Sequence, residues 1–388
     1  MANWRRFGLD EVLAHFQELE DPRSSINRKH PLASVVVVAL IAVLAGASGP
    51  TAIARWAAFK EELLTAVLPL PNGVPGKDVF RRVLMALRPE AFQACFAAWV
   101  RALRGEAEAA TGIERPTLAV DGKTLRRSHD RKNGLGPLHA VSVWASEYGL
   151  SLGQAACDEK SNEITAIPEL LKLVDVAGAV VTIDAMGCQK EIVETVAAAK
   201  GDYVLALKGN QGTLHQAVVD HVLKRWDDDF AGEPIGRRQT VETGHGRRES
   251  RTDIQLEAPK GLPGFESWRG LRSIGVVVSE SVRDGKPADE VRYFISSLPV
   301  GPGAKAFAHA VRSHWGVENG CHWTLDVTYR EDESRIRARH LRENMAWLNR
   351  FSLSLLKQHP GRDSVAMKRR ICGWSDDYLM QVVSGSTC

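Results

Sequence analysis

Three acidic side chains stand where a metal-dependent reaction would need them. Asp184 follows the apolar run Val180–Ile183 in VVTIDAMGCQKE, and Asp121 follows Thr117–Val120 in TLAVDGKT. An acid at the mouth of a buried strand is costly unless it binds something positive. The third acid, Glu318, lies on a predicted helix in HWGVENGCHW. Carboxylate oxygens are the ligands that Mg²⁺ prefers, so the three acids predict a divalent-metal site.

Positive side chains follow the same strands, as a phosphate-bearing substrate would require. Two divalent ions about 4 Å apart can activate the attacking oxygen of a phosphodiester reaction and stabilise the leaving one. The predicted chemistry needs no Ser, Cys or His nucleophile. Candidate phosphate contacts follow Asp121 and, later, the predicted strand Tyr203–Leu207; they are Lys123, Arg126, Arg127, Lys208, Asn210 and Gln211.

The helix that carries Glu318 brings further candidates to the same site. His314, Glu318 and His322 are spaced four residues apart, which places them on one face of a helix. Trp315 and Trp323 could stack on unpaired bases. Ordinary packing of this helix against a sheet explains the two tryptophans equally well.

The same residues allow other interpretations. A lone Asp at a strand end is most often a helix cap, but two acids at matched strand ends favour a shared site. DGKT resembles the end of a nucleotide-binding phosphate loop, but Thr117 stands where the first glycine should be, which excludes that motif. The histidines around Glu318 could bind zinc, but their spacing is not HExxH and would leave Asp121 and Asp184 unexplained. Asp326 is the alternative third acid.

The composition is that of an ordinary globular protein, and 388 residues predict two or three domains. The net charge of +3 does not by itself indicate a nucleic-acid partner. Basic residues cluster, however, in 122–132 and 236–251, and such patches beside acidic pockets suit a phosphodiester substrate; solvated charged faces are the alternative. Six cysteines without a CxxC pair indicate neither a disulfide framework nor a zinc site. The charged start MANWRRFGLDE indicates no secretory signal.

One segment is apolar enough to raise the question of a membrane. From Pro31 to Ala54 there is no charged residue, and VVVVALIAVLAG is strongly apolar. A bilayer span needs about 20 such residues. The small, turn-forming run Ala45–Pro50 instead favours a buried helix that ends near Gly46. We therefore expect a core helix, with a membrane anchor as the alternative.

The predicted elements alternate in a recognisable order. Apolar spacing predicts helices up to about residue 104, then a polar linker from Arg104 to Pro116. Three strands, a helix, a strand, a helix and a strand are expected next, at 117–120, 138–145, 150–156, 163–174, 179–183, 189–200 and 203–207. That order is the order of the ribonuclease-H-like fold, in which the first and fourth strands are neighbours. Strand-like segments between 231 and 300 predict a β-rich insertion, and helices return from about Gly303.

Taken together, several motifs resemble the DDE transposases of bacterial insertion sequences, in their H-repeat-associated branch. The resembling segments reach from about residue 16 to 340 and are FQELEDPR, HPLASVVVVALIAVLAG, LAVDGKTLR, EKSNEITAIPELL, VTIDAMGCQKEI, YVLALKGNQ, ETGHGRRESR and RSHWGVENGCHWTLDVTYREDESRIR. Asp121, Asp184 and Glu318 match the family's catalytic acids one by one. Around the third acid, Val311 and His314 stand where the wider group has Tyr and Arg.

The resemblance implies an α/β protein with a ribonuclease-H-like catalytic core and a β-rich insertion, preceded by an all-helical N-terminal domain. The expected divisions are a helical transposase-associated domain (1–104), the first part of the core (115–230), the insertion (231–300) and a helical C-terminal part of the core with the third acid (301–388).

The resemblance also implies an enzyme that cleaves the ends of an element and transfers the 3′-hydroxyl strand to target DNA. Its expected cofactor is Mg²⁺, with Mn²⁺ able to substitute, held by Asp121, Asp184 and Glu318. Expected partners are double-stranded DNA with terminal inverted repeats, target DNA, and a second copy of the chain in a homodimer on paired ends. We expect it in the cytoplasm, at the nucleoid, and not on a membrane. Further candidate DNA contacts are His245, Arg247, Arg251, His314 and Trp315. The alternative is a domesticated relative that binds or nicks DNA without mobilising anything.

Overall fold

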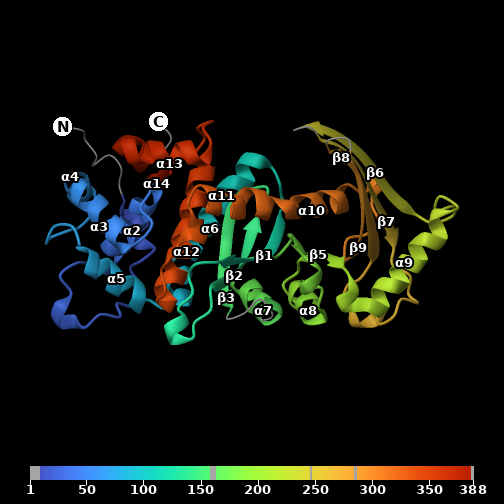
Figure 1. Ribbon diagram of the computed structural model, residues 1–388, viewed down its shortest axis with the longest axis horizontal. Coiled ribbons are helices and arrows are strands. Elements are labelled where there is room, and N and C mark those ends of the chain that lie inside the picture. Colours follow the sequence, from blue (N-terminus) through green and yellow to red (C-terminus); the bar gives the residue numbers. More distant parts are fainter. Residues whose placement is uncertain (1–8, 158–162, 245–246, 284–285, 386–388) are drawn as a thin grey trace.

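The computed structural model describes residues 9–157, 163–244, 247–283 and 286–385. Within them the chain begins with helices, continues through a nine-stranded sheet and ends in helices (Figure 1). The α-helices before the first strand are α1 (Asp10–Ala14), α2 (Leu32–Leu44), α3 (Pro50–Phe59), α4 (Glu61–Val67), α5 (Lys77–Ala86) and α6 (Pro89–Thr111).

Helix α2 is the apolar segment of the sequence, and it lies in the core. Every side chain from Val35 to Leu44 is fully buried. The helix ends before Gly46, whose φ of 110° lies in a region that favours glycine. The prediction of a buried helix ending near Gly46 is confirmed. None of the helices in the described residues has the length and apolar character needed to cross a membrane.

The linker predicted from Arg104 to Pro116 is wrong, because helix α6 continues to Thr111. The segment RGEAEAAT is rich in Ala and Glu, which are strong helix formers. Arg104 Nε also lies 3.0 Å from Glu108 Oε1, one turn further along the helix. Gly112, with φ of 68°, ends the helix in the left-handed conformation typical of a C-terminal cap.

The nine strands form a single mixed sheet in the order β3-β2-β1-β4-β5-β9-β8-β7-β6. Strands β1, β4 and β5 are parallel, and the other pairs are antiparallel. The strands are β1 (Thr117–Leu125), β2 (Leu138–Ala145), β3 (Leu150–Cys157), β4 (Val180–Ile183), β5 (Asp202–Leu207), β6 (Ile235–Gly244), β7 (Arg247–Glu257), β8 (Ser273–Arg283) and β9 (Lys286–Ser296). The predicted pairing of the first and fourth strands is confirmed.

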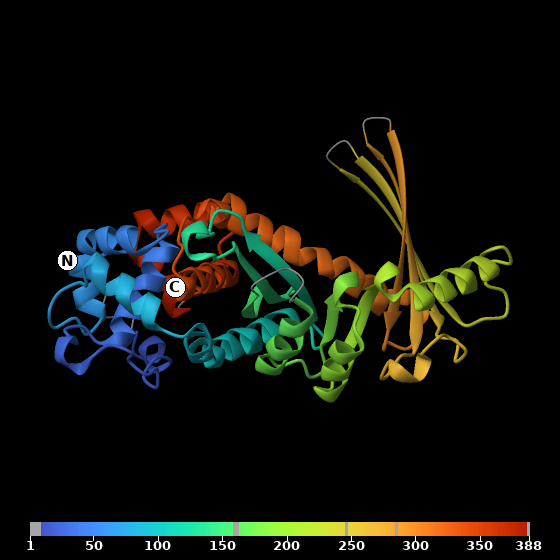
Figure 2. The same ribbon diagram turned by 60° about the horizontal axis from the view of Figure 1, so that its bottom comes forward.

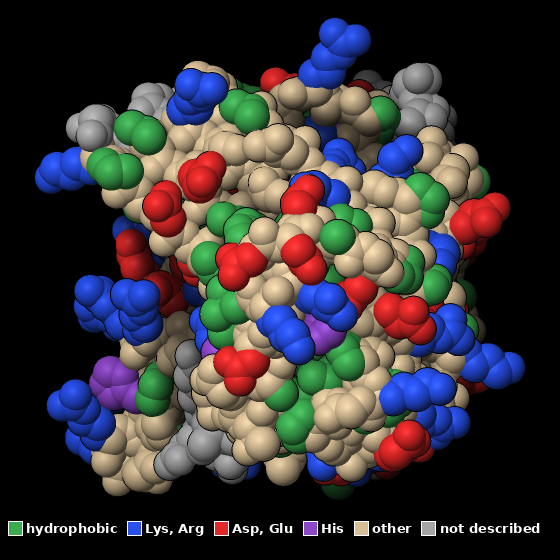
Figure 3. Space-filling view, turned by 90° about the vertical axis from the view of Figure 1, so that its right-hand side faces the viewer, with side chains coloured by type: hydrophobic (Ala, Val, Ile, Leu, Met, Phe, Trp, Pro, Cys, Tyr) green, Lys and Arg blue, Asp and Glu red, His purple; other side chains and the backbone are tan. Residues whose placement is uncertain are grey.

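The β-rich insertion predicted for 231–300 consists of β6 to β9, which extend the same sheet because β9 pairs with β5. The four strands project well beyond the neighbouring helices (Figure 2). At this end of the molecule, positive and negative side chains are interspersed over the surface rather than separated into single-sign patches (Figure 3).

Helices cover the sheet and link it to the N-terminal helices. They are α7 (Glu163–Leu173), α8 (Lys190–Ala198), α9 (Gly212–Trp226), α10 (Lys305–Gly316), α11 (Trp323–Val327), α12 (Arg339–Gln358), α13 (Val365–Trp374) and α14 (Asp376–Ser384). Helix α10 crosses β1 and β4, and α12 packs against α2, α5, α6 and β3 (Figure 1). Phe96 of α6 packs edge-on against Phe351 of α12 at 4.5 Å between ring centroids. The long helix α12 thus joins both ends of the chain to the sheet.

Candidate active site

Asp121 and Asp184 follow the last register pair of two neighbouring parallel strands. That pair is Val120 of β1 with Ile183 of β4, and each acid is the next residue of its chain segment. The two acids therefore follow the same end of this strand pair. Adjacent strands lie about 4.8 Å apart, so the backbones of the two acids are close together. Asp184 follows the end of β4, as predicted. Asp121 does not end β1, because that strand continues to Leu125 along β2.

A tight turn fixes the orientation of Asp184. Its Oδ1 accepts hydrogen bonds from the backbone N–H groups of Met186 at 3.1 Å and Gly187 at 3.3 Å. Gly187 has no substitute in this turn, since a Cβ there would lie 2.2 Å from Cγ2 of Ile183. Asp184 itself is exposed, and its Oδ2 accepts no hydrogen bond from any residue that the structure describes. One carboxylate oxygen is therefore held by the fold and the other is left for a ligand.

Asp121 is more buried, and a histidine on the helical segment beyond Glu318 stabilises its charge. Its Oδ1 accepts the N–H of Gly122 at 2.9 Å, and its Oδ2 lies 3.4 Å from His322 Nδ1. Burial alone would raise the pKa of Asp121. The hydrogen bond and charge of His322, the charge of His314 and the Gly122 N–H outweigh burial and hold the pKa below its ordinary value. His322 Nε2 is buried and has no hydrogen-bond partner among the described residues.

Glu318 lies on a π-helical turn, Val317–His322, inserted between α10 and α11. Such turns are rare and often mark functional sites, because the extra residue re-aims the side chains that follow. The carboxylate of Glu318 is exposed, and none of the described cations forms an ion pair with it. The predicted helical position of the third acid is therefore right, but the turn is wider than an α-helix.

The charges of all three acids act on His314. Its Nδ1 is 3.1 Å from Oγ1 of Thr182, two residues before Asp184, which ties α10 to β4. Burial lowers the pKa of His314, whereas the negative charges of Asp121, Asp184 and Glu318 each raise it, and the net shift is downward. All three acids thus act electrostatically on one imidazole, although their residues are far apart in the sequence.

The donors fit a divalent cation in chemistry but do not form a finished coordination shell. Hard carboxylate oxygens suit Mg²⁺ or Mn²⁺, and the Oδ2 of Asp184 is open to a ligand. Within the part of the chain that the structure describes, no group of three or more His, Cys, Asp or Glu side chains is close enough to hold a metal ion. The acids would have to draw together to share an ion.

A cleft of about 460 Å³ opens beside Asp184 and Glu318. Its wall includes side chains from five parts of the chain, among them Asp184, Lys208, Glu290, Arg292, His314, Trp315 and Glu318. The Arg292 guanidinium lies 4.6 Å from the ring centroid of Trp315, so one face of this indole is already covered. Trp323, by contrast, is 61% exposed, which does not fit the packing alternative for that residue.

Sequence reasoning missed two contributors to this region, His322 as a partner of Asp121 and Arg292 as a cover for Trp315. The spacing of His322 from Glu318 was a usable signal for the first. Arg292 reaches the cleft only because β9 pairs with β5, and no local pattern in the sequence indicated that pairing.

The predicted contacts after β5 divide into two kinds. Lys208 is exposed and lines the cleft. Asn210 Nδ2 instead donates to the carbonyl of Ala185 at 2.6 Å, and Gln211 Nε2 donates to the carbonyl of Cys188 at 3.0 Å. These two amides therefore brace the turn that carries Asp184.

Lys123 is not the exposed phosphate contact that its position suggested, and this prediction is corrected. Its side chain is only 7% exposed, with Nζ 2.5 Å from Asp326 Oδ1 and 3.3 Å from Asp332 Oδ1. Because residues alternate between the two faces of a strand, the side chain of Lys123 lies on the face of β1 that the protein covers. Asp326, the alternative third acid, is engaged in this ion pair. Arg126 and Arg127, beyond the end of the strand, are exposed as predicted.

Arg251 is corrected for the same reason. Its side chain is 8% exposed, and its Nε lies 3.1 Å from Oδ1 of Asp253, the next residue on the same face of β7. Arg247 begins β7, but its side chain lies outside the described part of the chain, as does all of His245. The prediction that these two residues contact DNA is therefore not tested by the structure.

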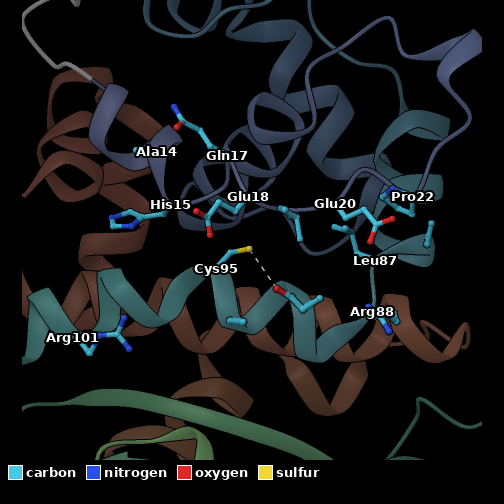
Figure 4. A pocket seen from close by; sticks show the side chains of 14 residues that line it. Ala14, His15, Gln17, Glu18, Glu20, Pro22, Leu87, Arg88, Cys95 and Arg101 are labelled. Carbon is cyan, nitrogen blue, oxygen red and sulfur yellow. Dashed lines mark hydrogen bonds between the residues drawn. The ribbon is translucent and has the colours of Figure 1, made fainter.

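A separate cavity of about 840 Å³ lies between the segment after α1 and helix α6, far from β1 and β4 in the chain (Figure 4). His15, Glu18, Cys95 and Arg101 are among the side chains that line it. None of the three acids does. Cys95 Sγ donates to the carbonyl of Ala91 at 3.4 Å, and burial raises the pKa of this thiol, so it is not an activated nucleophile.

Comparison with known proteins assigns the chain to a class. The Transposase DDE domain family matches residues 112–355, and the DDE_Tnp_1-associated family matches residues 13–100. The chain belongs to the DDE transposase family, and its relatives place it in the H-repeat-associated branch.

Two relatives from Escherichia coli have names that describe them as putative transposases. The H repeat-associated YhhI of strain K12 is 34% identical, covering 97% of this chain and 99% of that protein. YncI of O157:H7 is 35% identical, covering 97% and 95%. Among solved structures, a piggyBac transposase synaptic complex with hairpin DNA matches 98% of this chain and 80% of that chain, with 12% identity and a TM-score of 0.39; so distant a likeness carries no argument.

Proposed function

We propose that this transposase cleaves DNA at the ends of an insertion sequence and joins the freed 3′-hydroxyl strand to target DNA, using divalent metal ions. The observation that carries the proposal is the placement of Asp121 and Asp184 next to one register pair of β1 and β4, with Asp184 and Glu318 on the wall of one cleft. The family assignment supports it, because the family is that of the transposase DDE domain.

The order of the first five strands supports a ribonuclease-H-like core. Strands β1, β4 and β5 are parallel, β2 and β3 are antiparallel to β1, and the order is β3-β2-β1-β4-β5. On this proposal residues 1–104 form the helical N-terminal domain, 115–230 the first part of the core, 231–300 the insertion and 301–388 the C-terminal part of the core. Helix α6 would connect the first two rigidly, since it continues past residue 104.

Asp121, Asp184 and Glu318 would hold Mg²⁺, with Mn²⁺ able to substitute. When bound, two such ions activate the attacking oxygen and stabilise the leaving oxygen of an in-line phosphodiester displacement. The protein's own part is to position the carboxylates. The turn at Met186 and Gly187 aims Asp184, His322 restrains Asp121, and His314 anchors the helix before Glu318 to β4.

The proposed partners are double-stranded DNA with terminal inverted repeats, target DNA and a second copy of the chain that pairs the two ends. Lys208 at the cleft and the exposed Arg126 and Arg127 are candidates for phosphate contact. His314 lies against Thr182 and one face of Trp315 is covered by Arg292, so any DNA contact by these two residues would be made from the cleft wall that they line. A transposase with these partners would act in the cytoplasm, at the nucleoid.

The proposal is tested by Asp184→Asn with DNA that carries the element's own inverted repeats. Asparagine keeps an Oδ1 that accepts the Met186 and Gly187 N–H groups, so the turn survives while the open carboxylate oxygen is lost. Cleavage in Mg²⁺ is expected to fall below detection, and retention of the DNA on a native gel is expected to stay near that of the unaltered protein.

The matched control is Asp363→Asn, an exposed acid between α12 and α13; it should cleave normally. Undiminished cleavage by Asp184→Asn would remove this residue from the reaction. Equal loss of cleavage and of DNA retention would make Asp184 a structural residue instead.

A further inference from the structure

A row of exposed arginines lies outside the site described above. Arg335, Arg337 and Arg339 are exposed, whereas Ile336 and Ala338 between them are partly buried and pack against the core. The backbone from residue 334 to 338 belongs to neither helix nor strand, and Ser334 and Ala338 both have extended dihedral angles. The alternation of exposed arginines with the partly buried Ile336 and Ala338 places the arginines on the outer side of this segment. We call Arg335, Arg337 and Arg339, the last of which begins α12, the arginine strip.

The strip is held firmly at both ends. Before it, Glu331 is fully buried and lies 3.2 Å from Nη1 of the equally buried Arg350. After it, Arg342 Nη1 donates to the carbonyls of Ser128 at 3.2 Å and Gly136 at 2.7 Å. In the middle, Ile336 approaches Gly49 in the turn before α3. A charged face that is only solvated needs no such anchoring. The fixed backbone of the strip therefore favours a surface that binds a partner.

A second basic segment lies beside the strip. Arg342 bonds to the loop between β1 and β2 at both carbonyls named above, and Arg126 Nε lies 3.3 Å from Asp332 Oδ2. The charge of Arg337 also reaches Asp130, where it adds to the stronger effect of the Asn133 hydrogen bond in lowering the pKa. The loop and the strip thus form one surface, which we call the basic shelf: residues 126–132 and 330–339.

The basic shelf is strongly positive at its surface. It carries eight Arg or Lys side chains, all exposed, against four acids. Of those acids, Glu331 is buried with Arg350, Asp332 is paired with Lys123 and Arg126, and Glu333 is paired with Arg330. Arg335 and Arg337 are exposed, and the planar donors of their guanidinium groups match phosphate oxygens in pairs. Arg335 to Arg339 covers about 13 Å, long enough to meet more than one phosphate of a duplex, whose strands each carry one phosphate per about 3.4 Å of helix axis.

We propose that the basic shelf binds the phosphate backbone of duplex DNA and holds the flank of the substrate next to the three acids. Strand β1 runs from Asp121 to Leu125 and then directly into the shelf, a distance of about 13 Å. The buried Lys123, bound to Asp326 and Asp332, fixes the shelf to that strand. This inference rests on the proposed function for its substrate. It adds residues 330–339 to the basic cluster that the sequence indicated at 122–132, and makes one binding surface of the two segments.

The test is the salt dependence of DNA binding by the double variant Arg335→Gln/Arg337→Gln. The probe is a fluorescent 30-base-pair duplex of arbitrary sequence, because phosphate contacts are independent of sequence. Binding is measured by anisotropy in EDTA, so that it does not depend on metal chemistry. Each lost phosphate contact lowers the slope of log K against log salt by about 0.9, so the slope should fall by about 2.

The matched control is Arg362→Gln/Arg370→Gln, which removes the same charge from exposed positions beyond the other end of α12, a helix of 20 residues and so about 30 Å long. Its slope should stay within about 0.5 of that of the unaltered protein. Both double variants should have the same urea midpoint as the parent, because all four side chains are exposed.

A slope for Arg335→Gln/Arg337→Gln equal to that of the parent would overturn the inference, as would an equal fall in the control. Binding of the shelf to polyglutamate in preference to the duplex would also overturn it, in favour of an acidic protein partner. Because no cleavage is measured, loss of the proposed catalytic function by itself leaves these results unchanged.

Discussion

Burial separates the side chains of the site into those that can meet a ligand and those that hold the site together. Asp184 and Glu318 are exposed, whereas Lys123 and Arg251 lie inside with carboxylate partners. A buried amine paired with carboxylates is costly to unpair, because the charges left behind lose their compensation. Lys123 therefore belongs to the framework of the site rather than to its contacts with substrate.

Replacing Lys123 with Met should destabilise the protein without changing its phosphate contacts. Asp326 and Asp332 are 36% and 26% exposed, so water compensates part of the loss, and we expect about 1–3 kcal/mol less free energy of unfolding. Urea denaturation measures this loss. The salt slope for duplex binding should stay that of the parent under conditions where the variant is folded; a slope lowered by about 1 would show that Lys123 does contact phosphate.

At the scale of residues, the sequence predicted the strand pairing that brings Asp121 and Asp184 together, but not the burial of Lys123 and Arg251. Asp121 and Asp184 could be found because each follows an apolar run, and strand pairing then brings them together. The inward direction of Lys123 depends on which face of β1 the C-terminal helices cover, and no local pattern states this. Its partners Asp326 and Asp332 lie about 200 residues away in the sequence.

Among the elements, helix α10 positions Glu318, which follows it in the chain, next to the sheet. His314 ties it to β4, and His309 ties it to the turn between β2 and β3 through Glu147, with Nε2 to Oε1 at 2.7 Å. Glu147 is 6% exposed at its side chain and also accepts the Thr117 N–H at 2.8 Å. The hydrogen bond to Glu147 is the main cause of a raised pKa of His309, against the opposing effect of burial.

The contact between His309 and Glu147 predicts a pH dependence of stability. A histidine whose pKa is raised by folding stabilises the native state fully below its unfolded pKa of about 6.5, and this stabilisation is lost as the pH rises through the folded pKa. Between pH 6 and pH 8 the parent should therefore lose more stability than His309→Gln does. Because the ring is 54% exposed, we expect a difference under about 1 kcal/mol. Urea midpoints of both proteins at the two pH values measure it, and parallel pH profiles would refute the role of His309.

The sequence predicted the kinds of elements better than their ends. Strand β2 and the buried helix α2 match their predictions because both have clear apolar patterns and clear turn signals. Helix α6 is longer than predicted because Gly105 and the polar residues after it are typical of a linker, whereas the Ala and Glu residues among them favour a helix. The π-helical turn at Glu318 has no signature in spacing, since it differs from an α-helix by a single extra residue per turn.

For the whole molecule, the continuous sheet explains how an insertion can contribute to the site. Strand β9 pairs with β5 and so places Arg292 over Trp315 at the edge of the cleft. On the other side of the site, strand β1 leads to the basic shelf. The shelf also meets the N-terminal part of the chain, since Ile336 approaches Gly49 in the turn before α3. Sequence analysis could predict each part, but it could not predict that β5 and β9 pair across about 80 intervening residues.

The central claim is that three carboxylates from distant parts of the chain bind the metal ions of the reaction. Counting bound Mn²⁺ by electron paramagnetic resonance, with element-end DNA present, tests this most directly. The unaltered protein should bind about two Mn²⁺ per chain. The variant Asp121→Asn/Asp184→Asn/Glu318→Gln should bind none tightly while still retaining the DNA. An unchanged Mn²⁺ count in that folded triple variant would contradict the account.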